Sequence, residues 1–337
     1  MKKIVIFDEF NEIDLKPSDL LHKYIELTEG DVRTSFLKDS LKDCACPGCH
    51  GLNIRSSYTK FDMCYRECAE CWTLYVSPRP NDATLEHYYR QSAAREFWHS
   101  ELSKMTRKTR KEKIIKPRFE WIIDSTAEFN PHAAHIVDLN TDQYGYIEEM
   151  IQASFFKKKT LLNPFLHFNN DYPATCIDII DSPPKEKDLE GRVDVVTIFE
   201  VADRIADVDR LFERIYSLLK KNGLCFMTNI LISGFDLQVL WERAENIFPP
   251  DRLNVFSIEG LNALFARHNF ECVELSTPGI LDVEIVEKAI KQQSETRIPR
   301  FLEYILQKRG ADTRQSFQEF LQENLLSSYG RILLRKN

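Results

Sequence analysis

Four cysteines in two closely spaced pairs restrict the folding of this chain more than any other feature. They form the pattern C-x2-C-x18-C-x2-C, made of Cys46, Cys49, Cys68 and Cys71. Two thiolates two residues apart can lie on one tight turn and reach the same ion, and two such turns supply the tetrahedral sulfur shell that Zn²⁺ prefers. We therefore predict a zinc ribbon over residues 44–80. Because protein thiolates fill all four positions, the predicted zinc is structural rather than catalytic.

Neighbouring side chains offer alternative ligands to the same ion. Cys44 and Cys64 lie two and four residues from a predicted ligand, and His50 directly follows Cys49. We prefer the two regular pairs; four buried free thiols are the other interpretation.

No apolar run is long enough to span a bilayer, and the first ten residues do not form a signal peptide. We therefore expect a cytoplasmic protein without a membrane span, whose cysteines bind metal or stay reduced.

The charge balance restricts the class of partner. The chain carries 45 basic and 52 acidic residues, a net charge of −7, which argues against a nucleic-acid partner. One segment departs from this balance, since residues 104–118 hold eight Lys or Arg and one Glu. We interpret it as the solvated face of a helix, with a site for a phosphate-bearing ligand as the alternative.

From residue 135 onward, short apolar runs alternate with helical patterns. The runs are nearly continuous rather than alternating, which predicts a parallel sheet covered on both faces. A helix is predicted over 207–223, ending at Asn222-Gly223, and 331–336 is predicted as a last edge strand. The predicted strands are 135–139, 159–165, 175–181, 193–201, 224–232 and 271–275. We divide the chain into an N-terminal helical segment (1–43), the zinc ribbon (44–80), a helical linker region (81–134) and an α/β Rossmann-like domain with C-terminal helices (135–337).

This order of parts resembles the zinc-ribbon class I S-adenosylmethionine (SAM) methyltransferases, often encoded among genes for surface-polysaccharide or sugar-nucleotide modification. The ribbon is followed by "SPRP", by a helix containing "YY", and by the α/β region. Residues 193–229 resemble the fourth strand, helix and fifth strand of that family, and residues 248–274 resemble the segment that follows. The resemblance implies a mostly parallel sheet of seven strands whose last strand is antiparallel. It also implies that SAM lies across the carboxyl ends of the first and fourth strands.

The resemblance assigns residues to the SAM site, although the glycine pattern of the first loop is degenerate. Asp138 ends the first strand, as an acid does in the family, but Asn140, Asp142 and Tyr144 replace the family's glycines. A one-residue insertion would instead bring Gly145 into the position of the last glycine. Glycine in such a loop permits positive φ and close approach of the ligand, and Asn and Asp tolerate that backbone region better than other residues.

Five further positions complete the assignment. Asn163 stands at the end of the second strand, where the family has the carboxylate that binds the ribose. Phe199 and Glu200 end the fourth strand, on the adenine side. Arg204 and Arg252 stand where relatives often have histidine. Arginine cannot act as a general base near neutral pH, but it binds phosphate or carboxylate well, so we assign both arginines to the substrate.

Two functional hypotheses follow. The first is a SAM-dependent methyltransferase that acts on a small sugar-derived or nucleotide-linked acceptor, with a phosphate-bearing molecule among the candidates. The second is an inactive pseudo-methyltransferase that keeps the fold and serves as a binding or partner subunit. The sequence leaves open whether the chain is an enzyme.

Overall fold

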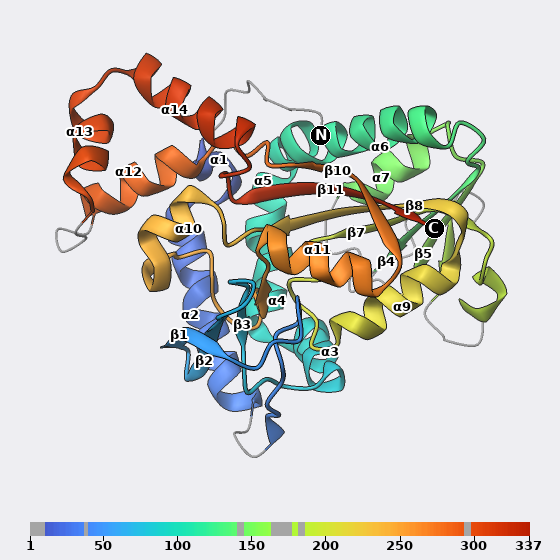
Figure 1. Ribbon diagram of the computed structural model, residues 1–337, viewed down its shortest axis with the longest axis horizontal. Coiled ribbons are helices and arrows are strands. Elements are labelled where there is room, and N and C mark those ends of the chain that lie inside the picture. Colours follow the sequence, from blue (N-terminus) through green and yellow to red (C-terminus); the bar gives the residue numbers. More distant parts are fainter. Residues whose placement is uncertain (1–10, 37–39, 140–144, 163–176, 181–185, 293–297) are drawn as a thin grey trace.

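A seven-stranded sheet forms the centre of the computed structural model, which describes residues 11–36, 40–139, 145–162, 177–180, 186–292 and 298–337 (Figure 1). The strand order is β10-β11-β8-β7-β4-β5-β6. Strands β4 to β8 run parallel, whereas β11 is antiparallel to both of its neighbours. The strands are β4 (His135–Leu139), β5 (Lys158–Leu162), β6 (Asp178–Ile180), β7 (Val193–Phe199), β8 (Leu219–Ile230), β10 (Phe270–Ser276) and β11 (Tyr329–Lys336). The predicted methyltransferase-like sheet is confirmed.

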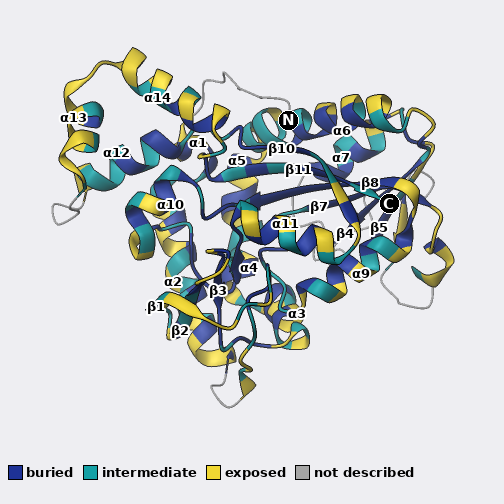
Figure 2. Cartoon of the chain, viewed as in Figure 1, coloured by how far each residue is buried: buried dark blue, intermediate teal, exposed yellow. Residues whose placement is uncertain are grey.

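Helices cover both faces of this sheet. Helices α6 (Lys116–Phe129) and α7 (Tyr146–Gln152) pack on one face, and α9 (Val208–Leu218) and α11 (Ile258–Arg267) pack on the other (Figure 1). The central strands are accordingly buried along most of their length (Figure 2). The nearly continuous apolar runs of the sequence arise because both faces of each central strand meet a helix.

Two predictions for the α/β region are wrong: the place of the last strand in the sheet and the end of one helix. The last strand, β11, is not at an edge but lies between β8 and β10, where Ile332, Leu333 and Leu334 are fully buried. Three consecutive buried apolar residues suit a strand covered on both faces, which an edge strand seldom is. Helix α9 ends at Leu218 rather than at residue 223, because Leu219 already pairs with Val193 in the sheet.

A second, smaller sheet contains the cysteines. Its antiparallel strands β1 (Ile54–Lys60), β2 (Met63–Cys68) and β3 (Leu74–Val76) are joined by β9 (Asn254–Val255), which comes from the segment after β8. The backbone N–H groups of Leu253 and Asn254 both donate to the carbonyl oxygen of Asp203. The segment around β9 is therefore bonded to the small sheet and to the turn that follows β7 of the large sheet.

Helices from both ends of the chain complete the structure. The N-terminal ones are α1 (Glu12–Leu15), α2 (Ser18–Ser35), α3 (Asp82–Gln91), α4 (Ala93–Phe97) and α5 (Ser103–Arg110). π-Helical turns at 98–102 and 111–115 join α4, α5 and α6. Asn81 is the N-cap of α3, and its side chain accepts a hydrogen bond from the Thr84 N–H. Helices α10 (Phe235–Leu240), α12 (Asp282–Gln292), α13 (Arg300–Lys308) and α14 (Ala311–Glu323) lie together at one side (Figure 1). Among the described residues, no helix combines the length and apolar character that crossing a membrane requires.

Two buried carboxyl groups meet where α10 and α12 pack together. Asp282 of α12 accepts hydrogen bonds from Ser327 Oγ, the Ser328 N–H and Gln318 Nε2. Asp236 of α10 is completely buried beside it. Burial, followed by repulsion from Asp282, raises the pKa of Asp236 well above its ordinary value. The folded chain thus keeps a proton on Asp236 that the unfolded chain releases above about pH 4.

Replacing Asp236 with asparagine is expected to stabilise the chain at pH 7. A raised folded pKa means that the stability of the native chain falls as pH rises from about 4 toward that pKa, and asparagine removes this loss. We expect a gain on the order of 1 kcal/mol, a common size for a single stabilising substitution. Urea denaturation at pH 4 and pH 7 measures it, with the exposed Asp188→Asn as control. A variant that is less stable than the native chain at pH 7 contradicts the prediction.

Candidate functional site

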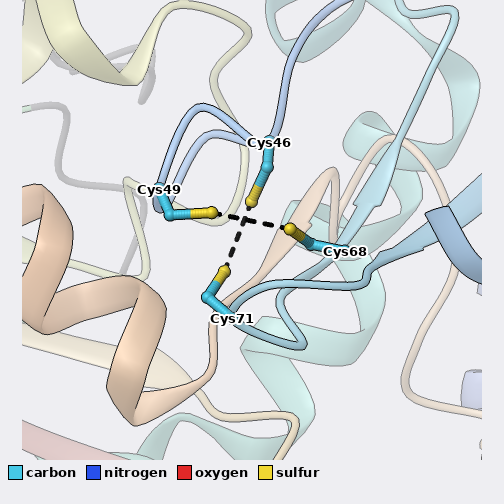
Figure 3. Close-up of side chains that lie close together, drawn as sticks. All are labelled: Cys46, Cys49, Cys68 and Cys71. Atoms are coloured by element: carbon cyan, nitrogen blue, oxygen red, sulfur yellow. Dashed lines mark hydrogen bonds between the residues drawn. The ribbon is translucent and has the colours of Figure 1, made fainter. Parts of the chain in front are cut away.

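The four predicted cysteine ligands converge on one point (Figure 3). Their sulfur atoms all lie within 4.8 Å of one another, with 3.5 Å between the sulfurs of Cys46 and Cys71 and between those of Cys49 and Cys68. A tetrahedral zinc site with Zn–S bonds of about 2.3 Å requires sulfurs about 3.8 Å apart. The four thiols therefore fit Zn²⁺, and this zinc would tie the two knuckle turns of the ribbon together.

The alternative ligands have other partners. The Cys44 thiol contacts the Val76 carbonyl at 3.7 Å, and the Cys64 thiol contacts the Tyr65 carbonyl at 3.6 Å. The His50 ring bonds to Asp209 at 2.8 Å. The geometry thus favours the two regular C-x2-C pairs.

Asp209, in the first turn of α9, anchors the ribbon to the large sheet. Besides His50, its carboxylate accepts from His268 Nε2 at 2.7 Å and from Arg267 Nε at 2.9 Å. Burial opposes ionisation of Asp209, but the hydrogen bonds from these three side chains outweigh it and lower its pKa to about 2. Arg267 also donates to the carbonyl oxygens of Pro47 and Gly48 in the first knuckle. A charged contact therefore links the ribbon to α9 and α11.

The ribbon also holds the segment that carries Arg252. The Tyr65 hydroxyl of β2 donates to the Arg252 carbonyl oxygen at 2.6 Å. The Val76 N–H of β3 donates to the Leu253 carbonyl oxygen at 2.8 Å, and Leu74 pairs with Val255 of β9. Three ribbon residues thus fix the backbone around Arg252, whose side chain reaches the large sheet.

A cavity of about 260 Å³ opens where Arg252 meets the carboxyl ends of β7 and β8. The start of the antiparallel strand β11 lies at the same edge. Helix α1, the first half of α2 and the turn from α5 to α6 form the other walls. Seven of the described lining residues are basic (Lys16, Arg110, Lys113, Arg118, Arg204, Arg252 and Arg331) and four are acidic (Glu12, Glu200, Asp251 and Asp282). The cavity is thus strongly basic in a chain of net charge −7.

Glu200 organises the arginines at the floor of the cavity. It follows β7 directly with a positive φ of 59°, a region that non-glycine residues seldom adopt. Its carboxylate is 2.9 Å from Arg118 Nη2, 3.1 Å from Arg252 Nη2 and 3.8 Å from Arg204 Nη2. Burial opposes ionisation of Glu200, but the charges of Arg252, Arg118 and Arg204 hold its pKa well below the ordinary value. Glu200 therefore stays ionised and fixes the arginines.

Asp203 forms a second ion pair with Arg252. It is completely buried, lies 3.3 Å from Arg252 Nη1 and accepts a hydrogen bond from the Asn229 side chain. Burial raises its pKa to about 6, partly offset by the charge of Arg252. Arg252 thus lies between two carboxyl groups of which Glu200 is the more acidic.

The predicted SAM site is described only in part, because Asn140, Asp142, Tyr144 and Asn163 lie outside the described residues. Gly145 has a φ of 88° and is the N-cap of α7, as suits the last glycine of the loop. The choice between the two alignments stays open, because residues 140–144 lie outside the described residues. In position and conformation, Gly145 fits a loop that would hold SAM at the switch point between β4 and β7.

Two other predicted cofactor residues lie beside this switch point. Asp138 is buried in β4 and accepts a hydrogen bond from Thr197 Oγ1 at 2.7 Å, and the same hydroxyl meets the Tyr146 hydroxyl at 2.8 Å. The Phe199 ring packs edge-on against Tyr146 and lies beneath the Arg118 guanidinium. Asp138 thus bonds across the sheet to β7, and Phe199 lies between Tyr146 of α7 and Arg118, which lines the basic cavity.

The prediction of a solvated helix face for residues 104–118 is wrong for part of the segment. Arg107 pairs with Glu148 and Lys116 with Glu112 at the surface, but Arg110, Lys113 and Arg118 line the cavity. These three, with Ile114 and Pro117, recur at the spacing of a single helix face. This periodicity is the sequence signal that could have placed these residues on one buried helix face. Lys16, which the sequence did not single out, has no comparable pattern around it.

Comparisons with known proteins agree with this fold. Residues 125–275, from α6 to β10, match a family model described as a methyltransferase domain. No curated protein sequence gives a significant match. Together with the strand order, this match shows a SAM-dependent methyltransferase-like fold.

The chain is also similar to several solved structures. One is the 1,6-didemethyltoxoflavin-N1-methyltransferase of Burkholderia thailandensis, with 12% identity, 83% of this chain and 98% of that chain covered, and a TM-score of 0.42. A SAM-dependent methyltransferase of Archaeoglobus fulgidus has 12% identity, 64% and 94% coverage and a TM-score of 0.39. Phosphoethanolamine N-methyltransferase 2 of Haemonchus contortus has 15% identity, 64% and 52% coverage and a TM-score of 0.39.

Proposed function

We propose that this chain is a SAM-dependent methyltransferase that acts on a small acceptor bound in the basic cavity. The observation that carries the proposal is the position of that cavity, at the carboxyl ends of β7 and β8 and beside the switch point of the sheet. In open α/β sheets, ligands bind at this edge. A sugar-derived or nucleotide-linked acceptor suits a cavity of about 260 Å³ lined by arginines.

The residues take distinct roles in this proposal. SAM, when bound, supplies an electrophilic methyl group on a sulfonium ion. Gly145 and the end of β4 would face its methionine part, and Phe199 would lie on its adenine side. Arg204 and Arg252, fixed by Glu200, would orient the acceptor, so that catalysis comes mainly from alignment of donor and acceptor. The four cysteines would bind a structural zinc that holds the segment of Arg252.

The second candidate is a pseudo-methyltransferase that binds a partner without transferring a methyl group. One observation favours it, because the Glu200 carboxylate at the end of β7 is already engaged by Arg118 and Arg252. Glu200 would then serve the internal arrangement of arginines rather than a cofactor. This candidate and the first differ in whether SAM binds.

Calorimetric titration with SAM and S-adenosylhomocysteine is expected to show micromolar binding by the native chain. Apolar surface buried around the ligand should also give a negative heat-capacity change. The Gly145→Val variant is the matched test, because a β-branched residue at φ 88° is strained and should weaken binding by more than tenfold. Gly191→Val, at φ 65° in a loop distant from the site, serves as control for the backbone change. Absence of binding by the native chain at millimolar ligand refutes the enzyme and leaves the pseudo-methyltransferase.

A further inference from the structure

Lys16 places a primary amine in the basic cavity, directly after α1. The side chain lines the cavity, whose floor carries Arg252 and whose wall carries Arg110. Helix α1 is held in place from two sides. Lys288 of α12 pairs with Glu12 at 3.0 Å, and Arg110 donates to the Leu15 carbonyl oxygen at 2.9 Å. Lys16 is therefore presented to the cavity by an anchored segment.

The charges around Lys16 come from four different elements. Glu12 of α1 and Glu200 after β7 attract its ammonium group, whereas Arg110 of α5 and Arg252 before β9 repel it. Glu12 is already paired with Lys288, and Glu200 with Arg118 and Arg252. The acids near Lys16 thus also form ion pairs with other basic side chains, and the region keeps an excess of positive charge.

Guanidinium groups in the cavity also have buried donors without a protein acceptor. Among the described residues, Arg252 Nε and Arg331 Nε are buried without a hydrogen-bond partner. Leaving a buried donor unsatisfied is costly, particularly on a charged group. An oxygen-rich anion in the cavity would satisfy both the charge and the donors.

We propose that Lys16, together with Arg110 and Arg252, binds a doubly charged oxyanion group of the acceptor, as found in a phosphate monoester or a diphosphate. The proposal rests on the proposed function in taking the bound molecule as the methyl acceptor. The charge balance favours a phosphate over a carboxylate, because seven cations face four acids in the described lining. One carboxylate would leave two of the three excess charges without a partner, whereas a phosphate dianion compensates two.

In the experiment, titration calorimetry measures the affinity of the full chain for pyrophosphate, which serves as the probe. The native chain is expected to bind pyrophosphate, and Lys16→Met should weaken binding at least about tenfold, the effect of one charge-assisted bond. Lys16→Arg keeps the charge and should retain most of the affinity. Lys23→Met is the matched control, because Lys23 lies on exposed α2 surface and pairs with Glu26. Unchanged pyrophosphate affinity in Lys16→Met overturns the proposal, and so does tighter binding of acetate than of pyrophosphate by the native chain.

The pH dependence gives a second readout. Burial is the main cause that lowers the pKa of Lys16 from its ordinary value. Pyrophosphate binding by the native chain should therefore fall at a pH below the ordinary lysine pKa of about 10.4, whereas Lys16→Arg should show no such fall. The same fall in both proteins counts against Lys16.

SAM titration of the same variants separates this proposal from the proposed function. We expect Lys16→Met to bind SAM as the native chain does. If the native chain binds pyrophosphate through Lys16 but binds no SAM, the anion subsite stands and the methyltransferase proposal fails. If SAM binds and Lys16→Met leaves pyrophosphate binding unchanged, the methyltransferase proposal stands and the anion subsite at Lys16 fails.

Discussion

Replacing Cys68 with serine is expected to release the zinc and to unfold the ribbon, with a loss of stability of several kcal/mol. Structural zinc contributes about 10–16 kcal/mol of apparent binding energy in small zinc-finger peptides, and that energy is folding energy. Cys68 is completely buried and belongs to β2, so its loss affects both the metal site and the small sheet. Metal analysis should fall from about one zinc per chain in the native protein toward zero, and the thermal transition should move to lower temperature.

The effect should extend to the cavity, because the ribbon fixes the backbone of Arg252 through Tyr65 and β9. Pyrophosphate binding is thus expected to weaken in Cys68→Ser, although Cys68 is not a lining residue. Cys64→Ser is the matched control, since Cys64 is in the same strand and its sulfur donates to the Tyr65 carbonyl oxygen. A Cys68→Ser chain that is metal-free and as stable as the native protein would refute the structural role of the zinc.

Replacing Glu200 with glutamine is expected to destabilise the chain by about 3 kcal/mol, the usual cost of removing one partner from a buried ion pair. Glutamine has the same length, so the change mainly removes a negative charge. Arg118, only 2% exposed, then loses its carboxylate partner, and Arg252 keeps the Asp203 carboxylate. Urea denaturation measures the loss. Glu112→Gln, which breaks an exposed pair with Lys116, should leave stability unchanged.

The pH dependence of this variant has a definite sign. The folded pKa of Glu200 lies well below its ordinary value, so its contribution to stability is present above about pH 4.5 and is lost as pH falls toward the folded pKa. The stability difference between the native chain and Glu200→Gln should therefore be largest near neutral pH and shrink below pH 4.5. A constant difference from pH 3 to pH 7 would show that the arginines do not hold Glu200 ionised.

The sequence predicted the elements whose signal is local. Near-continuous apolar runs located β4, β7 and β8, because strands covered on both faces need apolar residues at every position. The cysteine spacing located the knuckles, since a C-x2-C turn is short enough to be specified by its own residues. The same reasoning misplaced β11, because the sequence of a strand does not state which strands will flank it. The predicted end of helix α9, at Asn222-Gly223, lies too far along the chain, because an Asn-Gly pair suggests a helix end wherever it occurs.

The candidate site was less predictable, since its residues come from distant parts of the chain. Arg204 and Arg252 were named from resemblance and do line the cavity, but Arg118 was assigned to a solvated face. Lys16 lies in a segment without any motif, and only the packing of α1 between α5 and α12 places it at the cavity. Sequence spacing can show that a residue is on a helix face, but it cannot show what that face meets.

By itself, the sequence determined the two cysteine turns, the helices and strands of the α/β region and the loss of glycines from the first loop, because these depend on residues close together in the chain. The tertiary structure decided which charges meet. Glu200 and Arg118 are 82 residues apart, and Tyr65 and Arg252 are 187 apart, yet these contacts shape the cavity. A charge has no preferred partner in the sequence, because Coulomb attraction depends on distance and burial, and only folding sets both.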